Sequence, residues 1–230
     1  RTLPTGRVTV QGQLEGNLRS VSFRQLHLSL PGRFDLTGTG WVADMMRGSG
    51  HLRSDLHLKG TVGNIDFINS LLPKAVRRMV SIPYGIGLDG TVHVRKTLYT
   101  GRMRLTQGGG RIWMDGACNT ATGLYRLTAD ASAFPLQHFL PHMGLSSFSG
   151  FVRTQGHGTD FMNPRSSVNL SLRIQRFKYG KYVLDGLNGD VSKHGEQLSA
   201  HIKSTNRMLG GDFSYRGRMN AKSVNGHVRG

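Results

Sequence analysis

Apolar and polar residues alternate along most of this chain. In the segment 166–174, every second residue from Val168 to Ile174 is apolar, and the residues between them are polar. Successive side chains of a β-strand point to opposite faces of the sheet, so a period of two is typical of a strand with one dry and one wet face. Because the pattern recurs from residue 7 onward, the sequence predicts a succession of half-apolar strands.

Turn signals divide the first part of the chain into the following predicted strands: 7–11, 14–23, 26–30, 34–42, 50–52, 55–62, 86–95, 98–107, 110–115 and 124–131. From 158 to 230, strands are expected without a further helical signal. The Asp-Gly pairs at 89–90, 115–116 and 185–186 are the residue pair most favoured in tight hairpins, and we interpret them as turns.

Two interruptions of the alternation predict short helical elements, near 66–80 and 134–140. The segment 66–73 and the segment 134–141 both carry apolar residues and end in Leu-Pro, and each leads through a glycine into a new strand set. This similarity indicates a loose internal repeat.

These observations predict an all-β fold with two short helical elements, in which the strands share one apolar side. The residues expected on this side are Leu26, Leu28, Leu30, Leu56, Leu58, Val92, Val94, Met103, Leu105, Val168, Leu170, Leu172 and Ile174.

The charge of the chain indicates an anionic partner. Thirty Lys and Arg against thirteen Asp and Glu give a net charge of +17. Because the basic residues are spread along the sequence rather than clustered, nucleic acid is not the expected partner. One compact cluster, Lys74, Arg77 and Arg78, is predicted to bind an anionic head group or partner. The basic and aromatic run 173–182 is interpreted as a strand with a solvated cationic face.

No motif predicts catalysis, a cofactor or a metal ion. The string Gly85–Gly90 fits GxGxxG, but a strand-like segment follows where a phosphate site needs a helix. His138 and His142 have ligand spacing, but Pro141 lies between them and no third ligand is near in sequence. Neither a GxSxG motif nor a paired acid and base is present, so the chain is not expected to be an enzyme.

The chain has no apolar run of the length that spans a membrane, and it begins without a start methionine or a signal peptide. We therefore expect it to be a segment of a longer protein whose membrane anchor lies outside it. With Cys118 as the single cysteine, an internal disulfide is excluded.

Two features together resemble the AsmA-like superfamily, in particular the TamB-like proteins of Gram-negative bacteria. One is the repeated apolar helical element that ends in Leu-Pro before a glycine and a strand. The other is the run 156–164, Gly-His-Gly-Thr-Asp-Phe-Met-Asn-Pro, followed by the alternating strand 168–174.

The resemblance implies that the chain 1–230 is a single β-groove segment, in which an elongated, curled antiparallel sheet forms a half-open hydrophobic groove and the thirteen apolar residues named above face the groove and contact lipid. It implies that this groove is periplasmic and part of an inner-membrane-anchored parent protein that acts in outer-membrane biogenesis. It implies transport of phospholipid or an outer-membrane client, contact with outer-membrane assembly proteins, and no catalytic residues. The alternative from another class is a basic β-rich structural or binding module that docks nucleic acid or an acidic protein. In either case, open sheet edges predict edge-to-edge association of this segment.

Overall fold

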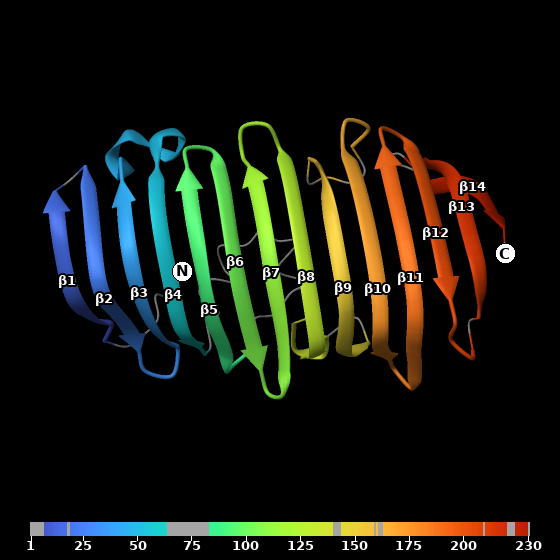
Figure 1. Cartoon of the computed structure of the whole chain (residues 1–230), viewed down its shortest axis with the longest axis horizontal. Helices are drawn as coiled ribbons and strands as arrows, with labels where there is room; N and C mark the ends of the chain where they lie inside the picture. Colours follow the sequence, from blue (N-terminus) through green and yellow to red (C-terminus); the bar gives the residue numbers. More distant parts are fainter. Residues whose placement is uncertain are drawn as a thin grey trace.

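The computed structural model is a single antiparallel sheet of fourteen strands (Figure 1). The strands follow one another in the sheet in the same order as in the sequence, from β1 at one edge to β14 at the other. The structure describes residues 7–17, 19–63, 83–139, 144–158, 160, 163–208, 210–219 and 224–229. The predicted all-β fold is confirmed.

The strands are β1 Thr9–Asn17, β2 Ser20–Leu30, β3 Phe34–Ala43, β4 Arg53–Val62, β5 Ile86–Arg95, β6 Leu98–Gln107, β7 Gly110–Asn119, β8 Leu124–Pro135, β9 Leu145–His157, β10 Ser167–Tyr179, β11 Tyr182–His194, β12 Gln197–Ser204, β13 Gly211–Met219 and β14 Val224–Arg229. Two 3-10 helices, η1 Met45–Arg47 and η2 Ser49–His51, precede β4, and one short helix, α3 Leu136–Phe139, follows β8. Each strand is antiparallel to its neighbours in the sheet, as β4 is to β3 and β5.

Short turns explain why each strand pairs with the next. Asparagine side chains close two of the turns. The side-chain oxygen Oδ1 of Asn17 accepts hydrogen bonds from the backbone N–H groups of Arg19 and Ser20, at 2.8 and 3.2 Å. The side-chain oxygen of Asn119 accepts the same two hydrogen bonds from the backbone N–H groups of Ala121 and Thr122. Asparagine favours turns for this reason, because its side chain imitates a backbone turn.

Several predicted strand boundaries are wrong. The predicted strands 7–11, 14–23 and 26–30 are two longer strands, β1 and β2, joined by the turn after Asn17. A β-bulge at Gln25, where φ is 50°, leaves Phe23 and Leu26 opposite Gly40 and Gly38, and therefore on one face. The sequence predicted that one strand ends at residue 23 and another begins at residue 26. The structure has a bulge within a single strand at this place. The predicted strand 50–52 overlaps η2.

The three Asp-Gly pairs are inside strands β5, β7 and β11 and not in hairpin turns. Asp89 and Asp115 each lie opposite an arginine of β6. At Gly90, an added Cβ would lie 2.7 Å from the Arg102 carbonyl oxygen, so the close strand requires glycine there. These aspartates pair with residues of a neighbouring strand, and a pattern of adjacent residues in the sequence cannot predict such a pair.

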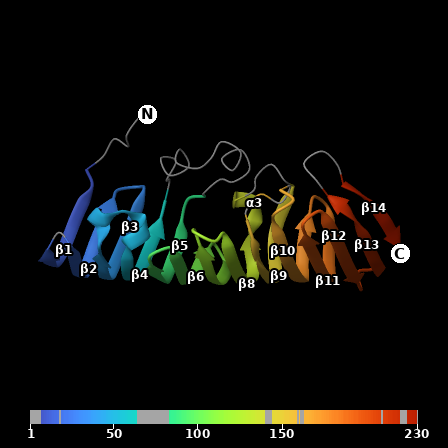
Figure 2. The same ribbon diagram turned by 90° about the horizontal axis from the view of Figure 1, so that it is seen from above.

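Of the two predicted helical elements, the one near 66–80 lies outside the described residues. Near 134–140, Phe134 and Pro135 end β8 and only Leu136–Phe139 is helical. The rings of Phe134 and Phe139 stack with centroids 4.9 Å apart. His138 bonds to the Gln107 side chain at 3.1 Å, which holds α3 against one face of the sheet (Figure 2).

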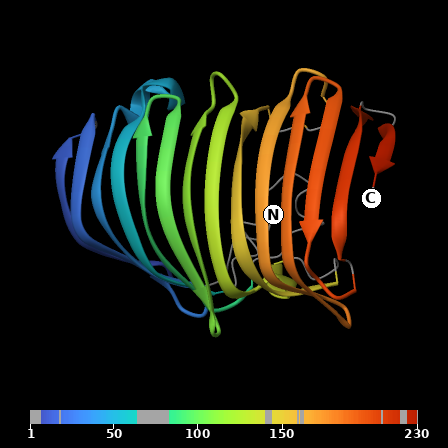
Figure 3. The same cartoon turned by 45° about the vertical axis from the view of Figure 1, so that its right-hand side comes forward.

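The strands bend along their length (Figure 3). The half-open groove that we expected this bending to create stays a prediction. Within the described part of the chain, no helix has the length and apolar content needed to cross a membrane.

Candidate functional site

One face of the sheet is apolar across nearly all of its strands. The register shows this most simply through one row of opposed residues. Leu26 lies opposite Gly38, and Gly38 lies opposite Leu58. The row then continues through Gly90, Met103, Met114, Ala129, Val152, Leu172, Gly189, Ile202 and Phe213. We call this side of the sheet the apolar face and the other side the polar face.

The structure brings all thirteen predicted groove residues to the apolar face, because directly opposed residues of neighbouring strands point to the same side. Leu56, for example, lies opposite Val92, and Leu88 lies opposite Leu105. Their contact with lipid stays a prediction. The predicted head-group residues Lys74, Arg77 and Arg78 lie outside the described residues.

The apolar face is covered unequally. Leu30 and Val94 are buried, with 2% and 4% of their surface exposed, and the other eleven predicted groove residues are half-buried. Near the two edges the face is open: Leu14 of β1 is 62% exposed and Ile202 of β12 is 41% exposed. Large exposed apolar patches on proteins commonly mark interaction or ligand-binding sites.

Among the described strand residues, Lys193 is the charged residue on the apolar face. It lies opposite Val168 and Leu198, and only 1% of its surface is exposed. Its ammonium donates hydrogen bonds to the Ser166 hydroxyl at 2.8 Å, to the Asn163 carbonyl at 3.0 Å and to the Ser166 carbonyl at 3.3 Å. The three bonds use all three N–H donors of the lysine, so a buried charge is fully hydrogen-bonded. Sequence reasoning missed Lys193, although it follows the alternating apolar residues Leu187 and Val191 of β11.

The polar face carries charged side chains that pair across strands in the part from β2 to β7. Asp55 bonds to His93 at 2.6 Å and accepts both of its other hydrogen bonds from Arg95, at 2.9 and 3.0 Å. These bonds lower the pKa of the Asp55 carboxyl, that from Arg95 first and that from His93 second. Opposite charges that face each other stabilise a strand pair.

A second cluster repeats this arrangement further along the face. His57 bonds to Asp89 at 3.0 Å, and Arg104 donates to the same carboxylate at 3.2 Å. The hydrogen bond with His57 is the main cause of the lowered pKa of Asp89, and the charge of Arg104 lowers it further. Arg102 and Asp115, directly opposed on β6 and β7, bond at 2.8 Å.

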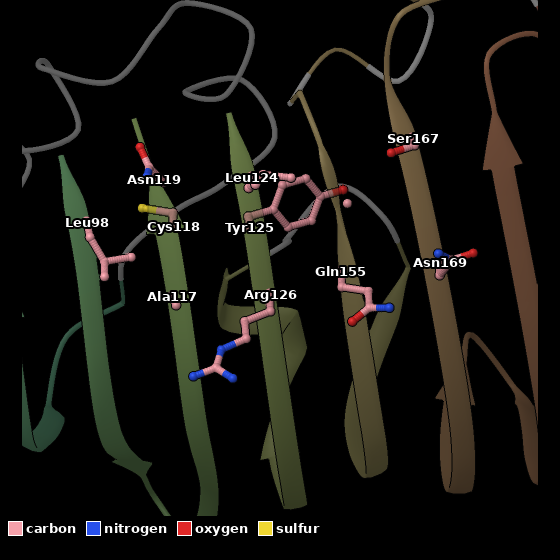
Figure 4. Close-up of a pocket in the computed structure, with 11 residues that line it drawn as sticks. Leu98, Ala117, Cys118, Asn119, Leu124, Tyr125, Arg126, Gln155, Ser167 and Asn169 are labelled. Atoms are coloured by element: carbon pink, nitrogen blue, oxygen red, sulfur yellow. The ribbon is translucent and has the colours of Figure 1, made fainter. Parts of the chain in front are cut away.

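A depression of about 480 Å³ lies at one end of strands β6 to β10 (Figure 4). Most of its lining residues belong to the polar face. Leu98 and Leu124 form its apolar part and are 41% and 55% exposed, while Arg126 and Gln155 supply polar groups. Arg126, from β8, extends toward the neighbouring strand β7 (Figure 4). No sequence pattern indicates this depression, because its residues come from five strands.

The motifs considered for catalysis or metal binding do not converge in the part of the chain that is described. Gly87 and Gly90 are both inside strand β5, as the interpretation of that glycine string expected. His138 contacts Gln107, and His142 lies outside the described residues. Among described side chains, no three from His, Cys, Asp and Glu are placed to hold a metal ion.

Comparison with protein-family models, with curated proteins and with solved structures finds no match for this chain.

Proposed function

We propose that this chain is a periplasmic groove protein of outer-membrane biogenesis, similar to the TamB-like members of the AsmA-like superfamily. It carries phospholipid or an outer-membrane client between the inner and outer membranes, as part of a parent protein anchored in the inner membrane. The observation that supports this proposal is the apolar row that runs without a charged residue from Leu26 of β2 to Phe213 of β13.

The energetics of an acyl chain explain why such a surface suits transport. Burying one methylene contributes about 0.8 kcal/mol, so a chain of about sixteen carbons represents roughly 13 kcal/mol that is lost in water. On a continuous apolar face, this contribution changes little as the chain moves from strand to strand. Passage therefore requires uninterrupted apolar contact and no catalytic group.

The sheet edges support the predicted self-association. Strand β1 pairs only with β2, and β14 only with β13, among the described strands. The outer backbone groups of an edge strand can pair with another strand, and this is the usual route to edge-to-edge association. In the proposed function, such pairing would continue the apolar face from one unit to the next. Sedimentation velocity that shows a monomer at high concentration would contradict it.

The experiment that tests transport is extraction of lipid from the purified chain, followed by mass spectrometry. Leu58 is half-buried on the apolar face of β4, and Thr61 is exposed on the polar face of the same strand. We expect Leu58→Gln to lower the co-purified phospholipid at least about twofold, because an amide without a partner is unfavourable against acyl chains. Thr61→Gln is the matched control, and its lipid content should equal that of the unmodified protein.

Two results would overturn the proposed function. One is an unmodified protein that carries neither phospholipid nor a bound polypeptide after purification from a Gram-negative host. The other is an equal loss of lipid in Leu58→Gln and Thr61→Gln, since the lipid would then not distinguish the two faces. Circular dichroism on both variants separates a loss of binding from a loss of folding.

A further inference from the structure

The polar face differs between strands β5 to β7 and strands β8 to β10. On β5 and β6, Arg95, Arg102 and Arg104 are paired with carboxylates. Strands β8 to β10 carry Arg126, Arg153, Arg173 and Arg176, all exposed. Within the described residues, none of these four forms an ion pair.

Three of these arginines lie on one diagonal line. Arg126 is opposite Gln155, two residues from Arg153 on β9; Arg153 is opposite Ser171, two residues from Arg173 on β10. We call Arg126, Arg153 and Arg173 the arginine diagonal. Each step crosses one strand and moves two residues along it, which by sheet geometry is about 8 Å. The charged groups are therefore regularly spaced.

The first arginine of the diagonal borders the strand-end depression. Arg126 lines this depression together with the exposed Leu98 and Leu124. A site that joins apolar contact with an arginine is typical of the centres of protein interfaces, where arginine is enriched. An apolar side chain of a ligand could therefore bind in the depression, next to the first arginine of the diagonal.

We propose that the polar face of β8 to β10 binds an extended acidic segment of a partner protein. Carboxylates on every second residue of this segment pair with the arginine diagonal, and an apolar side chain at its end occupies the strand-end depression. In an extended segment, side chains on one side repeat about every 6.8 Å, and flexible arginine side chains span the difference from about 8 Å. Guanidinium groups recognise carboxylates through two parallel hydrogen bonds.

Nucleic acid fits this surface less well. Single-stranded nucleic acid binds through bases that stack on free aromatic rings. The two aromatic rings at this level of the polar face are already occupied: Arg104 lies 5.2 Å from the Trp113 ring and Arg153 lies 5.7 Å from the Phe151 ring. A base could stack on these ring faces only by displacing the arginine that lies over each of them.

An anionic membrane surface fits less well for a different reason. Asp130, exposed on β8, lies opposite Phe151, and Asp190, on β11, lies opposite Ser171. These carboxylates lie beside the diagonal and would repel a continuous layer of anionic head groups. Separate carboxylates, spaced along a peptide, can contact the arginines between them. The surface therefore favours the acidic segment.

The test uses a fluorescein-labelled peptide in which glutamate alternates with serine and one end carries leucine. Fluorescence anisotropy is measured with the full chain and with the triple variant Arg126→Gln, Arg153→Gln and Arg173→Gln. Each exposed ion pair contributes about 1.4- to fivefold in affinity, so the loss of three should weaken binding by about tenfold. Replacing the peptide leucine by serine should weaken binding at least about threefold.

The matched control is the triple variant Arg95→Gln, Arg102→Gln and Arg104→Gln. It removes the same charge from the same face, but from arginines that are already paired with Asp55, Asp115 and Asp89. Its affinity for the peptide should stay within about twofold of the unmodified protein, because only the net charge has changed. Circular dichroism verifies that both triple variants fold.

Three results would overturn the proposal. They are an absence of peptide binding by the unmodified protein, an equal loss in both triple variants, and an unchanged affinity in the variant of the diagonal. Phosphatidylglycerol vesicles and a single-stranded oligonucleotide are measured in parallel. If the diagonal variant loses binding to either of these while it keeps the peptide, the surface serves a membrane or a nucleic acid instead. None of these outcomes depends on lipid in the apolar face.

Discussion

The apolar face and the polar face of the sheet differ in how their residues meet across the strands. On the apolar face, most opposed positions from β2 to β13 carry apolar residues or glycine, as in the pair Gly90 and Met103. On the polar face, opposed and diagonal positions carry particular partners, as in the pair Arg102 and Asp115. Hydrophobic burial is not directional, whereas ion pairs and hydrogen bonds depend on geometry.

The two faces also differ in how much their residues change along the sheet. The apolar row changes little along the sheet, and in the proposed function this suits a ligand that moves. The polar face is heterogeneous: Arg95 and Arg104 are paired with carboxylates, whereas the arginines of β8 to β10 form no ion pair with described residues. In our proposals, the uniform face carries lipid or a client, and the unpaired arginines bind a partner at one place.

The largest effect that separates the two faces is expected at neighbouring positions of β6. Leu105 lies on the apolar face opposite Leu88 and Ile112, and Thr106 lies on the polar face. Leu105→Asp should lower the free energy of unfolding by about 3 kcal/mol, since it removes apolar contact and brings an unpaired charge toward a half-buried surface. Urea unfolding followed by circular dichroism measures the change.

Thr106→Asp is the matched control, because it adds the same carboxylate to an exposed position beside Arg111. Its free energy of unfolding should stay within about 0.5 kcal/mol of the unmodified protein. Equal destabilisation by the two substitutions would mean that the faces do not differ in burial, and the comparison would fail.

The second effect concerns Lys193, the charged residue on the apolar face. Lys193→Met removes the ammonium that donates to Asn163 and Ser166 and leaves the oxygens of the buried Ser166 without that partner. A lost buried partner costs about 1–3 kcal/mol, and we expect a decrease of this size in the free energy of unfolding. Urea unfolding again gives the value.

Lys203→Met provides the comparison on the polar face. Lys203 is exposed and forms an ion pair with Asp212 at 3.5 Å. Exposed ion pairs contribute about 0–1 kcal/mol, so this variant should be the more stable of the two. If Lys193→Met is as stable as the unmodified protein, the lysine does not hold the loop before β10.

Much of the fold could be predicted because alternation determines both the strand and its buried side. The apolar residues of β10 recur at every second position, and any register that keeps them dry places them with those of β9. Strand boundaries were less predictable where they depend on a neighbouring strand, because turn signals consider only adjacent residues of the sequence. The bulge at Gln25 and the paired aspartates Asp89 and Asp115 depend on neighbouring strands, so their sequence neighbours suggested turns.

The site was only partly predictable for the same reason. The sequence showed which residues of a strand share a face, and this suffices for the apolar face. The arginine diagonal requires the register of three strands, and the strand-end depression requires five. Arg173 and Arg176 were noticed as part of a cationic run, but nothing in that run indicates that Arg126 and Arg153 continue it.

The smallest effect is the pH dependence that the paired aspartates of the polar face produce. The folded state lowers the pKa of Asp55 and of Asp89 below the ordinary value of 3.8. The folded protein therefore binds protons less readily than the unfolded chain, and this stabilisation is fully present above that value. It is lost as the pH falls below 3.8 and through the lowered pKa values. Urea midpoints from about pH 5 down to about pH 2 should thus decrease.

Asp55→Asn tests whether the paired half of the polar face causes this decrease. The amide keeps the shape of the side chain but cannot change charge, so part of the acid-dependent loss of stability should disappear. Asp130→Asn is the control, because Asp130 of β8 has neither an ion pair nor a side-chain hydrogen bond within the described residues. A pH profile flattened equally by both substitutions would show that total charge, rather than the pairing of Asp55 with Arg95 and His93, sets the acid sensitivity.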